Sequence, residues 1–183
     1  MKGHNVYLAI SLIFIAVLSR LIPHYPNFTA LGAAALFSGA LLRSNPLLAF
    51  GVPIASYWLS DLILNNLIYS AYYDGFVLFS PSAIYQYLAI AAMVALGRGL
   101  GQPKSTRLLG ASIAAATVFY LISNFGVWLS SGMYPHTLSG LLLCYEAGLP
   151  FFLKGTLPST ILYSYALFTV YAYLRRRVFA HSG

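Results

Sequence analysis

Six stretches of the chain are apolar and almost free of charged residues, and short polar segments separate them. They cover Val6–Ser19, Thr29–Leu42, Pro46–Ile68, Ile84–Leu96, Leu108–Leu129 and Leu157–Leu174. A helix that crosses a bilayer perpendicularly needs about 20 residues, so the third, fifth and sixth stretches are long enough. The other three are expected to extend into flanking residues or to be shielded by neighbouring helices.

Turn-forming residues lie between these stretches, among them Pro23, Pro26, Asn45-Pro46 and Asp74-Gly75. Such residues commonly end helices and form turns. One further apolar segment, Leu138–Phe152, contains Glu146 and Pro150. It is too short and too interrupted to span, and we expect a surface-lying or re-entrant helix.

The composition supports a membrane protein. Hydrophobic residues make up 60% of the chain and charged residues 7%, whereas a soluble domain has about 25% charged residues. The sequence therefore predicts an all-α, polytopic membrane bundle of about six transmembrane helices. We expect residues 1–183 to form a single transmembrane domain that contacts the lipid bilayer.

The basic residues predict an orientation, because cytoplasmic loops carry an excess of Lys and Arg. With the N-terminus inside and six alternating spans, the outer side receives only Arg20 and Lys154. The inner side receives Lys2, Arg43, Arg98, Lys104, Arg107, Arg175, Arg176 and Arg177. Both termini are therefore expected to be cytoplasmic.

The same topology gathers the polar residues of separate segments on the outer side. Ionisable residues in membrane segments commonly mark functional sites, so we expect an outward-facing substrate-binding site there. Its candidate residues are Arg20, His24, Asp61, Asn124, Trp128, His136 and Glu146.

Several of these residues allow a second interpretation. Asp61 either serves a ligand site or forms a structural ion pair with Arg20, and both can hold. Asn124 either contacts a ligand or bonds a neighbouring helix, as polar residues in membranes often do. Trp128 is equally typical of an aromatic anchor at the membrane interface.

The sequence identifies no cofactor and predicts no metal site. His24 and His136 are far apart in sequence, and no metal-binding spacing such as HxxxH or CxxC is present. Cys144 is either a soft ligand for a cobalt or haem centre or, more commonly, a packing residue. Nucleic-acid binding is not expected, since the cations form no continuous basic face.

Small residues recur at four-residue spacing in the second, fourth and fifth stretches. Examples are Ala35 with Gly39, Ala91 with Ala95, and Gly110 with Ala114. This spacing lets helix backbones approach closely. The contacts are expected either inside the bundle or with other membrane protein subunits, and the sequence does not choose between them.

Several motifs resemble a bacterial family of small six-helix membrane proteins that are labelled as transport proteins. They are Arg20 to Thr29, Ala33 to Phe37, Ser60-Asp61-Leu62, Ser123 to Leu129, Tyr134 to Leu141, and Cys144-Tyr145 with Leu149 to Phe152. In outline, that family is similar to the substrate-binding (S) components of energy-coupling-factor vitamin transporters. The resemblance implies a bacterial inner-membrane location, a ligand near the outer surface, and docking on a transmembrane partner.

Together these observations predict a non-enzymatic, substrate-binding membrane subunit of a transporter. Its ligand would be a small vitamin-like or metal-containing molecule, and an energising partner would be required. The alternative is a structural or accessory subunit of a larger membrane complex. In that case the polar residues would hold loops and neighbouring subunits.

Overall fold

The computed structural model describes residues 3–101 and 103–179, and in these residues the chain is helical without any strand. The α-helices are α1 (Gly3–Leu18), α2 (Leu31–Leu41), α3 (Pro46–Ile63), α4 (Ala83–Arg98), α5 (Ser105–Ser130), α6 (Leu138–Phe151) and α7 (Leu157–Phe179). Short 3-10 helices cover Ser19–Leu21 (η1) and Ser70–Tyr72 (η3). Single π turns cover Leu64–Ile68 (η2) and Phe152–Thr156 (η4).

The helix boundaries agree with the turn chemistry of the sequence. Asn45 caps α3, because its Oδ1 accepts a hydrogen bond of 3.2 Å from the backbone N–H of Leu48, and Pro46 follows in the first helical turn. Thr137 caps α6 in the same way through the N–H of Gly140. The predicted apolar stretches therefore correspond to α1, α2, α3 with η2, α4, α5 and α7.

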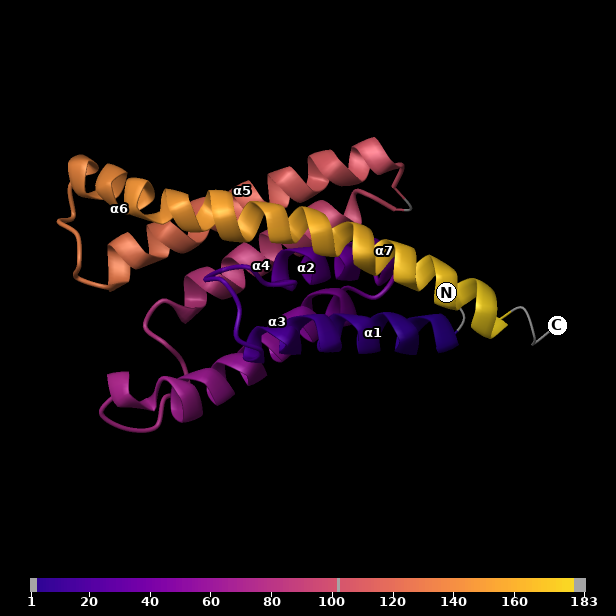
Figure 1. Cartoon of the computed structure of the whole chain (residues 1–183), viewed down its shortest axis with the longest axis horizontal. Helices are drawn as coiled ribbons and strands as arrows, with labels where there is room; N and C mark the ends of the chain where they lie inside the picture. The colour runs from indigo at the N-terminus through magenta and orange to yellow at the C-terminus, as the bar shows by residue number, and fades with distance from the viewer. Residues whose placement is uncertain (1–2, 102, 180–183) are drawn as a thin grey trace.

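The predicted separate segment Leu138–Phe152 differs from the structure. It forms α6 and continues through η4 into α7, so Leu138–Phe179 is one unbroken helical run (Figure 1). Pro150 does not end the helix; the wider π turn that begins two residues later accommodates the disturbed hydrogen-bond ladder. The segment is thus an extension of α7 that pairs with α5 and is not a separate helix.

Helix α2 lies at the centre of the bundle. All eleven of its residues are buried, and it packs against α1, α3, α4, α5 and α7. The closest approach is to α4: a Cβ on Gly39 would meet the carbonyl oxygen of Val94, and one on Gly97 would meet that of Leu36. In α2 the small-residue pattern therefore serves packing inside the bundle.

The exterior of the bundle is apolar. Large hydrophobic side chains are exposed along the long helices, including Leu88 on α4, Leu121 on α5 and Leu162 on α7. Inside, buried serines such as Ser56 and Ser112 donate hydrogen bonds to carbonyls four residues earlier, which satisfies their hydroxyls without water. This distribution is the reverse of that in a soluble helical bundle.

In the part of the chain that the structure describes, two helices are long and apolar enough to cross a membrane. They are Pro46–Ile68, which is α3 with η2, and Ser105–Ser130, which is α5. The sixth predicted stretch lies in α7, where several Tyr, Ser and Thr residues lower the hydropathy. Helix α2 measures only about 16 Å, at 1.5 Å per residue, and is enclosed by its neighbours.

The two ends of the bundle differ in what they contain. The start of α1 at Gly3 and the end of α7 at Phe179 lie at one end, named here the terminal end (Figure 1). The connections η1–α2, η2–α4 and α5–α6 lie at the other, named the open end. Because α2 is much shorter than α5, a space remains between its first residue, Leu31, and the open end.

Candidate functional site

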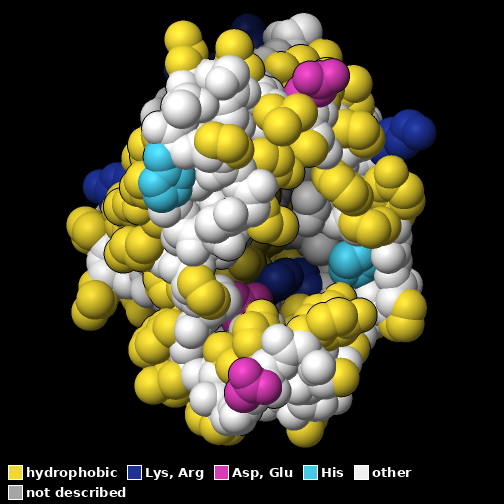
Figure 2. Space-filling view, turned by 90° about the vertical axis from the view of Figure 1, so that its left-hand side faces the viewer, with side chains coloured by type: hydrophobic (Ala, Val, Ile, Leu, Met, Phe, Trp, Pro, Cys, Tyr) yellow, Lys and Arg dark blue, Asp and Glu magenta, His cyan; other side chains and the backbone are white. Residues whose placement is uncertain are grey.

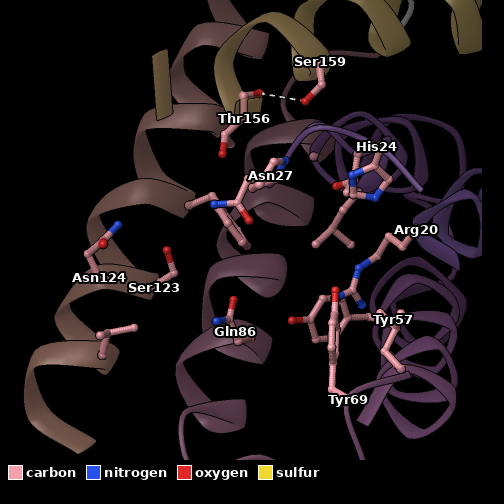
Figure 3. A pocket seen from close by; sticks show the side chains of 17 residues that line it. Arg20, His24, Asn27, Tyr57, Tyr69, Gln86, Ser123, Asn124, Thr156 and Ser159 are labelled. Atoms are coloured by element: carbon pink, nitrogen blue, oxygen red, sulfur yellow. Dashed lines mark hydrogen bonds between the residues drawn. The ribbon is translucent and has the colours of Figure 1, made fainter. Parts of the chain in front are cut away.

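A cavity of about 500 Å³ fills the space beyond the start of α2, and we name it the hollow. Figure 2 views the open end and shows a depression with a basic and an acidic side chain in its depth and a histidine at its rim. Figure 3 shows polar side chains from α4, α5, η4, α7 and the segment after α1 converging on this space. They are Arg20, His24, Asn27, Thr29, Gln86, Ser123, Asn124, Thr156 and Ser159, with Tyr57, Tyr69 and Phe119 as aromatic walls.

Arg20 projects into the hollow from η1 and is held by three groups of α3. Its Nη2 lies 2.9 Å from Asp61 Oδ1, and its Nη1 donates a 2.6 Å hydrogen bond to Ser60 Oγ. Its guanidinium also stacks over the Tyr57 ring, with 4.1 Å between Cζ and the ring centroid. The two charged side chains are each 15% exposed, so the pair is largely shielded from solvent. The expected Arg20–Asp61 ion pair is present.

Only one member of the ion pair lines the hollow. Arg20 lines the hollow, whereas Asp61 lies behind it and contacts the hollow only through the guanidinium. An arginine has five N–H donors in a fixed planar arrangement. Those not engaged by Asp61 and Ser60 can reach a ligand, and the carboxylate fixes their direction.

Gln86 of α4 contributes the least satisfied polar atom of the site. Its Oε1 is buried and accepts no hydrogen bond from any described residue. A buried acceptor without a partner costs about 1–3 kcal/mol, so such a group in a cavity wall favours a ligand that donates a hydrogen bond. Gln86 was not among the residues predicted for the site, although an amide within the apolar stretch Ile84–Leu96 was a usable signal.

Asn124 of α5 lines the hollow and also a side pocket of about 50 Å³. Its Nδ2 donates a 2.8 Å hydrogen bond to the carbonyl of Tyr120, one turn earlier. Its Oδ1 lies where a Cβ on Gly148 would stand. The Asn124 side chain therefore packs against α6 and bonds its own helix, without the expected hydrogen bond to a neighbouring helix among the described residues, and its contact with a ligand stays a prediction.

The first turn of α2 forms the floor of the hollow. Leu31 and Gly32 line the cavity, and Ala30 at the N-cap offers no side-chain acceptor. The first N–H groups of a helix have no partner within the helix and carry partial positive charge. With Arg20 nearby, this floor favours a ligand group that accepts hydrogen bonds.

The segment after η1 covers one side of the hollow. His24 is exposed and donates through Nδ1 to the carbonyl of Tyr25 at 2.8 Å. Asn27 has φ of 61°, a left-handed conformation in which Asn is one of the tolerated residues. The adjacent carbonyl of Pro26 lies against Gly155, where a Cβ would overlap with it. The absence of a side chain at Gly155 thus lets this segment dock on η4.

Three predicted site residues lie outside the hollow. Trp128 donates from Nε1 to the carbonyl of Pro135 at 2.9 Å, and its ring packs 5.4 Å from that of His136. These two residues shape the α5–α6 connection. Glu146 is exposed on α6. Trp128 and Glu146 lie on faces of α5 and α6 that do not line the cavity, and His136 lies in the connection between these helices.

Cys144 is buried and contacts the backbone of α5, with 3.3 Å between Sγ and the carbonyl oxygen of Asn124. Among the described residues, no three His, Cys, Asp or Glu side chains converge on a possible metal position. The environment of Cys144 is that of a packing residue between α5 and α6.

The described residues thus form an all-helical bundle with an apolar exterior, two helices long and apolar enough to cross a membrane, and a polar hollow at one end. Residues 2–181 match the sequence model of a family of unknown function (DUF6580), and the chain belongs to that family. No curated protein and no solved structure matches the chain.

Proposed function

We propose that this protein is a substrate-binding membrane subunit of a bacterial transporter and that the hollow holds its ligand. The observation that carries the proposal is the unpartnered Gln86 Oε1 in the wall of a cavity of about 500 Å³. Ligand sites commonly have volumes of about 300–1,000 Å³, apolar walls and a few converging polar groups. The hollow has such a volume and converging polar groups, although polar side chains make up more of its walls than in most ligand sites.

The proposed orientation places the open end outside and both termini in the cytoplasm. Six helical spans, α1, α2, α3, α4, α5 and α7, alternate across the inner membrane, with α2 shielded from lipid by its neighbours. The positive-inside rule supports this direction, because Arg43, Arg98, Lys104 and the arginines from Arg175 onward fall at the terminal end. The hollow would then capture ligand from outside.

The lining indicates the kind of ligand. Arg20 and the start of α2 supply donors, Gln86 supplies an acceptor, and Tyr57, Tyr69 and Phe119 supply aromatic surface. This combination fits a small, partly aromatic molecule that carries both acceptor and donor groups, as vitamin-like compounds do. Uptake against a gradient would require an energising partner protein.

Mass spectrometry of small molecules retained by the purified protein tests the proposal. The wild-type protein should retain one compound in near-stoichiometric amount after mild detergent extraction. Gln86→Leu removes the acceptor and keeps a side chain of similar size, so it should reduce retention at least tenfold, as expected for a lost buried hydrogen bond of about 1.5 kcal/mol. Asn124→Ala should reduce retention too.

Glu146→Gln provides the matched control, because Glu146 is polar and near the open end but outside the hollow. It should retain the compound as the wild type does. If no preparation retains a compound, or if Gln86→Leu and Glu146→Gln behave alike, the role of accessory subunit replaces the proposed one.

A further inference from the structure

A second cavity system lies at the terminal end, along the last turns of α7. Two adjoining cavities of about 440 and 520 Å³ share four lining residues, Pro103, Phe168, Ala172 and Arg176. We name them together the α7 groove. Phe168, Ala172 and Arg176 follow one another at four-residue spacing and therefore share one face of α7.

The groove exists because α7 extends past the start of α5. Helix α5 begins at Ser105, whose carbonyl accepts a 2.7 Å hydrogen bond from the Tyr165 hydroxyl. Beyond Tyr165 the two helices diverge (Figure 1), and the groove lies between the first turn of α5, with Ser105 and Leu108, and the last turns of α7. Phe168 and Tyr171, which both line the groove, pack edge-on against Phe37 of α2, and these contacts keep α7 attached to the bundle.

The charge at this end is not balanced by the side chains of the protein. The chain has only three acidic residues. Asp61 is paired with Arg20, Asp74 follows η3, and Glu146 lies on α6, so all three belong to the open half. Arg175 and Arg176, which are exposed and line the groove, consequently have no side-chain carboxylate within reach.

We propose that the α7 groove binds an anionic phospholipid. An acyl chain would lie along Phe168 and Ala172, and the phosphate would meet Arg175 and Arg176, whose planar donor groups suit phosphate oxygens. Basic pockets between membrane helices on the cytoplasmic side commonly receive anionic head groups. The inference rests on the proposed orientation but not on any ligand in the hollow.

Native mass spectrometry of the detergent-solubilised full chain tests this site with phosphatidylglycerol and phosphatidylcholine of identical acyl chains. Wild-type protein should retain phosphatidylglycerol preferentially. The double variant Arg175→Gln and Arg176→Gln should bind it about 30-fold more weakly, because each arginine near a membrane surface contributes about 1 kcal/mol and 1.4 kcal/mol corresponds to tenfold.

Two further variants separate groove binding from general charge attraction. Ala172→Phe fills the groove and keeps both arginines, so it should also lose the preference. Lys154→Gln removes an exposed cation of η4, outside the groove, and should leave retention unchanged. Inorganic phosphate at the same concentration should not displace the lipid.

Equal retention of the two lipids, insensitivity to Ala172→Phe, or displacement by inorganic phosphate would overturn the lipid site. A dimer that forms in phosphatidylcholine and dissociates only when the groove is altered would also overturn it. In that case a second copy of the chain, and not a lipid, would cover the α7 groove. Retention of a small molecule in the hollow is measured independently. Failure of the lipid site therefore leaves the proposed function testable by itself.

Discussion

The two ends of the bundle differ in whether their arginines have a carboxylate partner. At the open end Arg20 is held by Asp61, Ser60 and the Tyr57 ring, so a cation is fixed inside a polar cavity. At the terminal end Arg175 and Arg176 are exposed beside an apolar groove and have no side-chain carboxylate nearby. The first arrangement fixes the direction of its guanidinium, whereas the second leaves two guanidinium groups free of any side-chain carboxylate.

The difference follows from helix length. The central helix α2 stops short of the open end, and the surrounding helices enclose the resulting space. At the terminal end α7 extends past the start of α5 and diverges from it, so a groove opens between the two helices. An enclosed space suits directed hydrogen bonds with a small molecule, as proposed for the hollow, while an open groove suits a flexible chain with a charged head, as proposed for the α7 groove.

The largest expected effect concerns the ion pair that organises the open end. Asp61→Asn leaves the largely buried Arg20 without its counter-charge and should lower the free energy of unfolding by about 3 kcal/mol. Asp74→Asn, an exposed carboxylate of the same end, should change it by less than about 0.5 kcal/mol. Chemical denaturation in detergent measures both changes.

A double-mutant cycle then sharpens the comparison. Combining Asp61→Asn with Arg20→Met should restore part of the lost stability, since the second change removes the unpaired cation. If the two losses simply add, the residues are not energetic partners. The open end would then resemble the terminal end in leaving its arginine uncompensated.

A smaller change in the free energy of unfolding is expected at the close contact between α2 and α4. Gly39→Ala places a Cβ against the carbonyl of Val94 and should lower the free energy of unfolding by about 2 kcal/mol, as overpacking does. Gly110 of α5 has no atom within 4 Å of such a Cβ. Gly110→Ala should therefore raise stability by about 0.5 kcal/mol. Equal effects would contradict the close α2–α4 contact.

The smallest effect concerns the segment that covers the hollow. Asn27 is left-handed with φ of 61°, so Asn27→Gly should be nearly neutral for folding, whereas Asn27→Ala should cost about 1 kcal/mol. Thermal unfolding in detergent compares the two variants. Identical melting of both would show that this backbone conformation is not maintained, and that the open end is less ordered than described.

Much of the helical fold was predictable from the sequence because long apolar stretches alternate with turn-forming residues. The helix starts at Asn45-Pro46 and Thr137 depend on local capping, and capping residues can be recognised in the sequence. The continuity of α6 with α7 was not predictable from Pro150, because a neighbouring π turn absorbs the disturbance. Whether small residues face inward or outward also depends on tertiary packing, as Gly39 and Gly110 show.

The site was predictable only in part for a related reason. Topology assigns a residue to an end of the bundle but not to a helix face. Arg20, His24 and Asn124 line the hollow, and Asp61 supports it, whereas Trp128, His136 and Glu146 point elsewhere. Gln86, Thr156 and Ser159 were missed because single polar residues in apolar helices usually satisfy the backbone. Their convergence appears only in three dimensions.

Cysteine labelling at two positions of α5 tests the central claim most directly, namely that the hollow opens to the outside and the α7 groove to the cytoplasm. Ser123 lines the hollow and Ser105 lines the groove, and Ser→Cys is nearly isosteric at both. In a Cys144→Ala background, a small membrane-impermeant thiol reagent should modify a cysteine replacing Ser123 in intact cells. It should modify one replacing Ser105 only after the cells are opened. Labelling of the Ser105 position in intact cells, with the Ser123 position protected, would contradict the orientation and with it the proposed role in capturing ligand from outside.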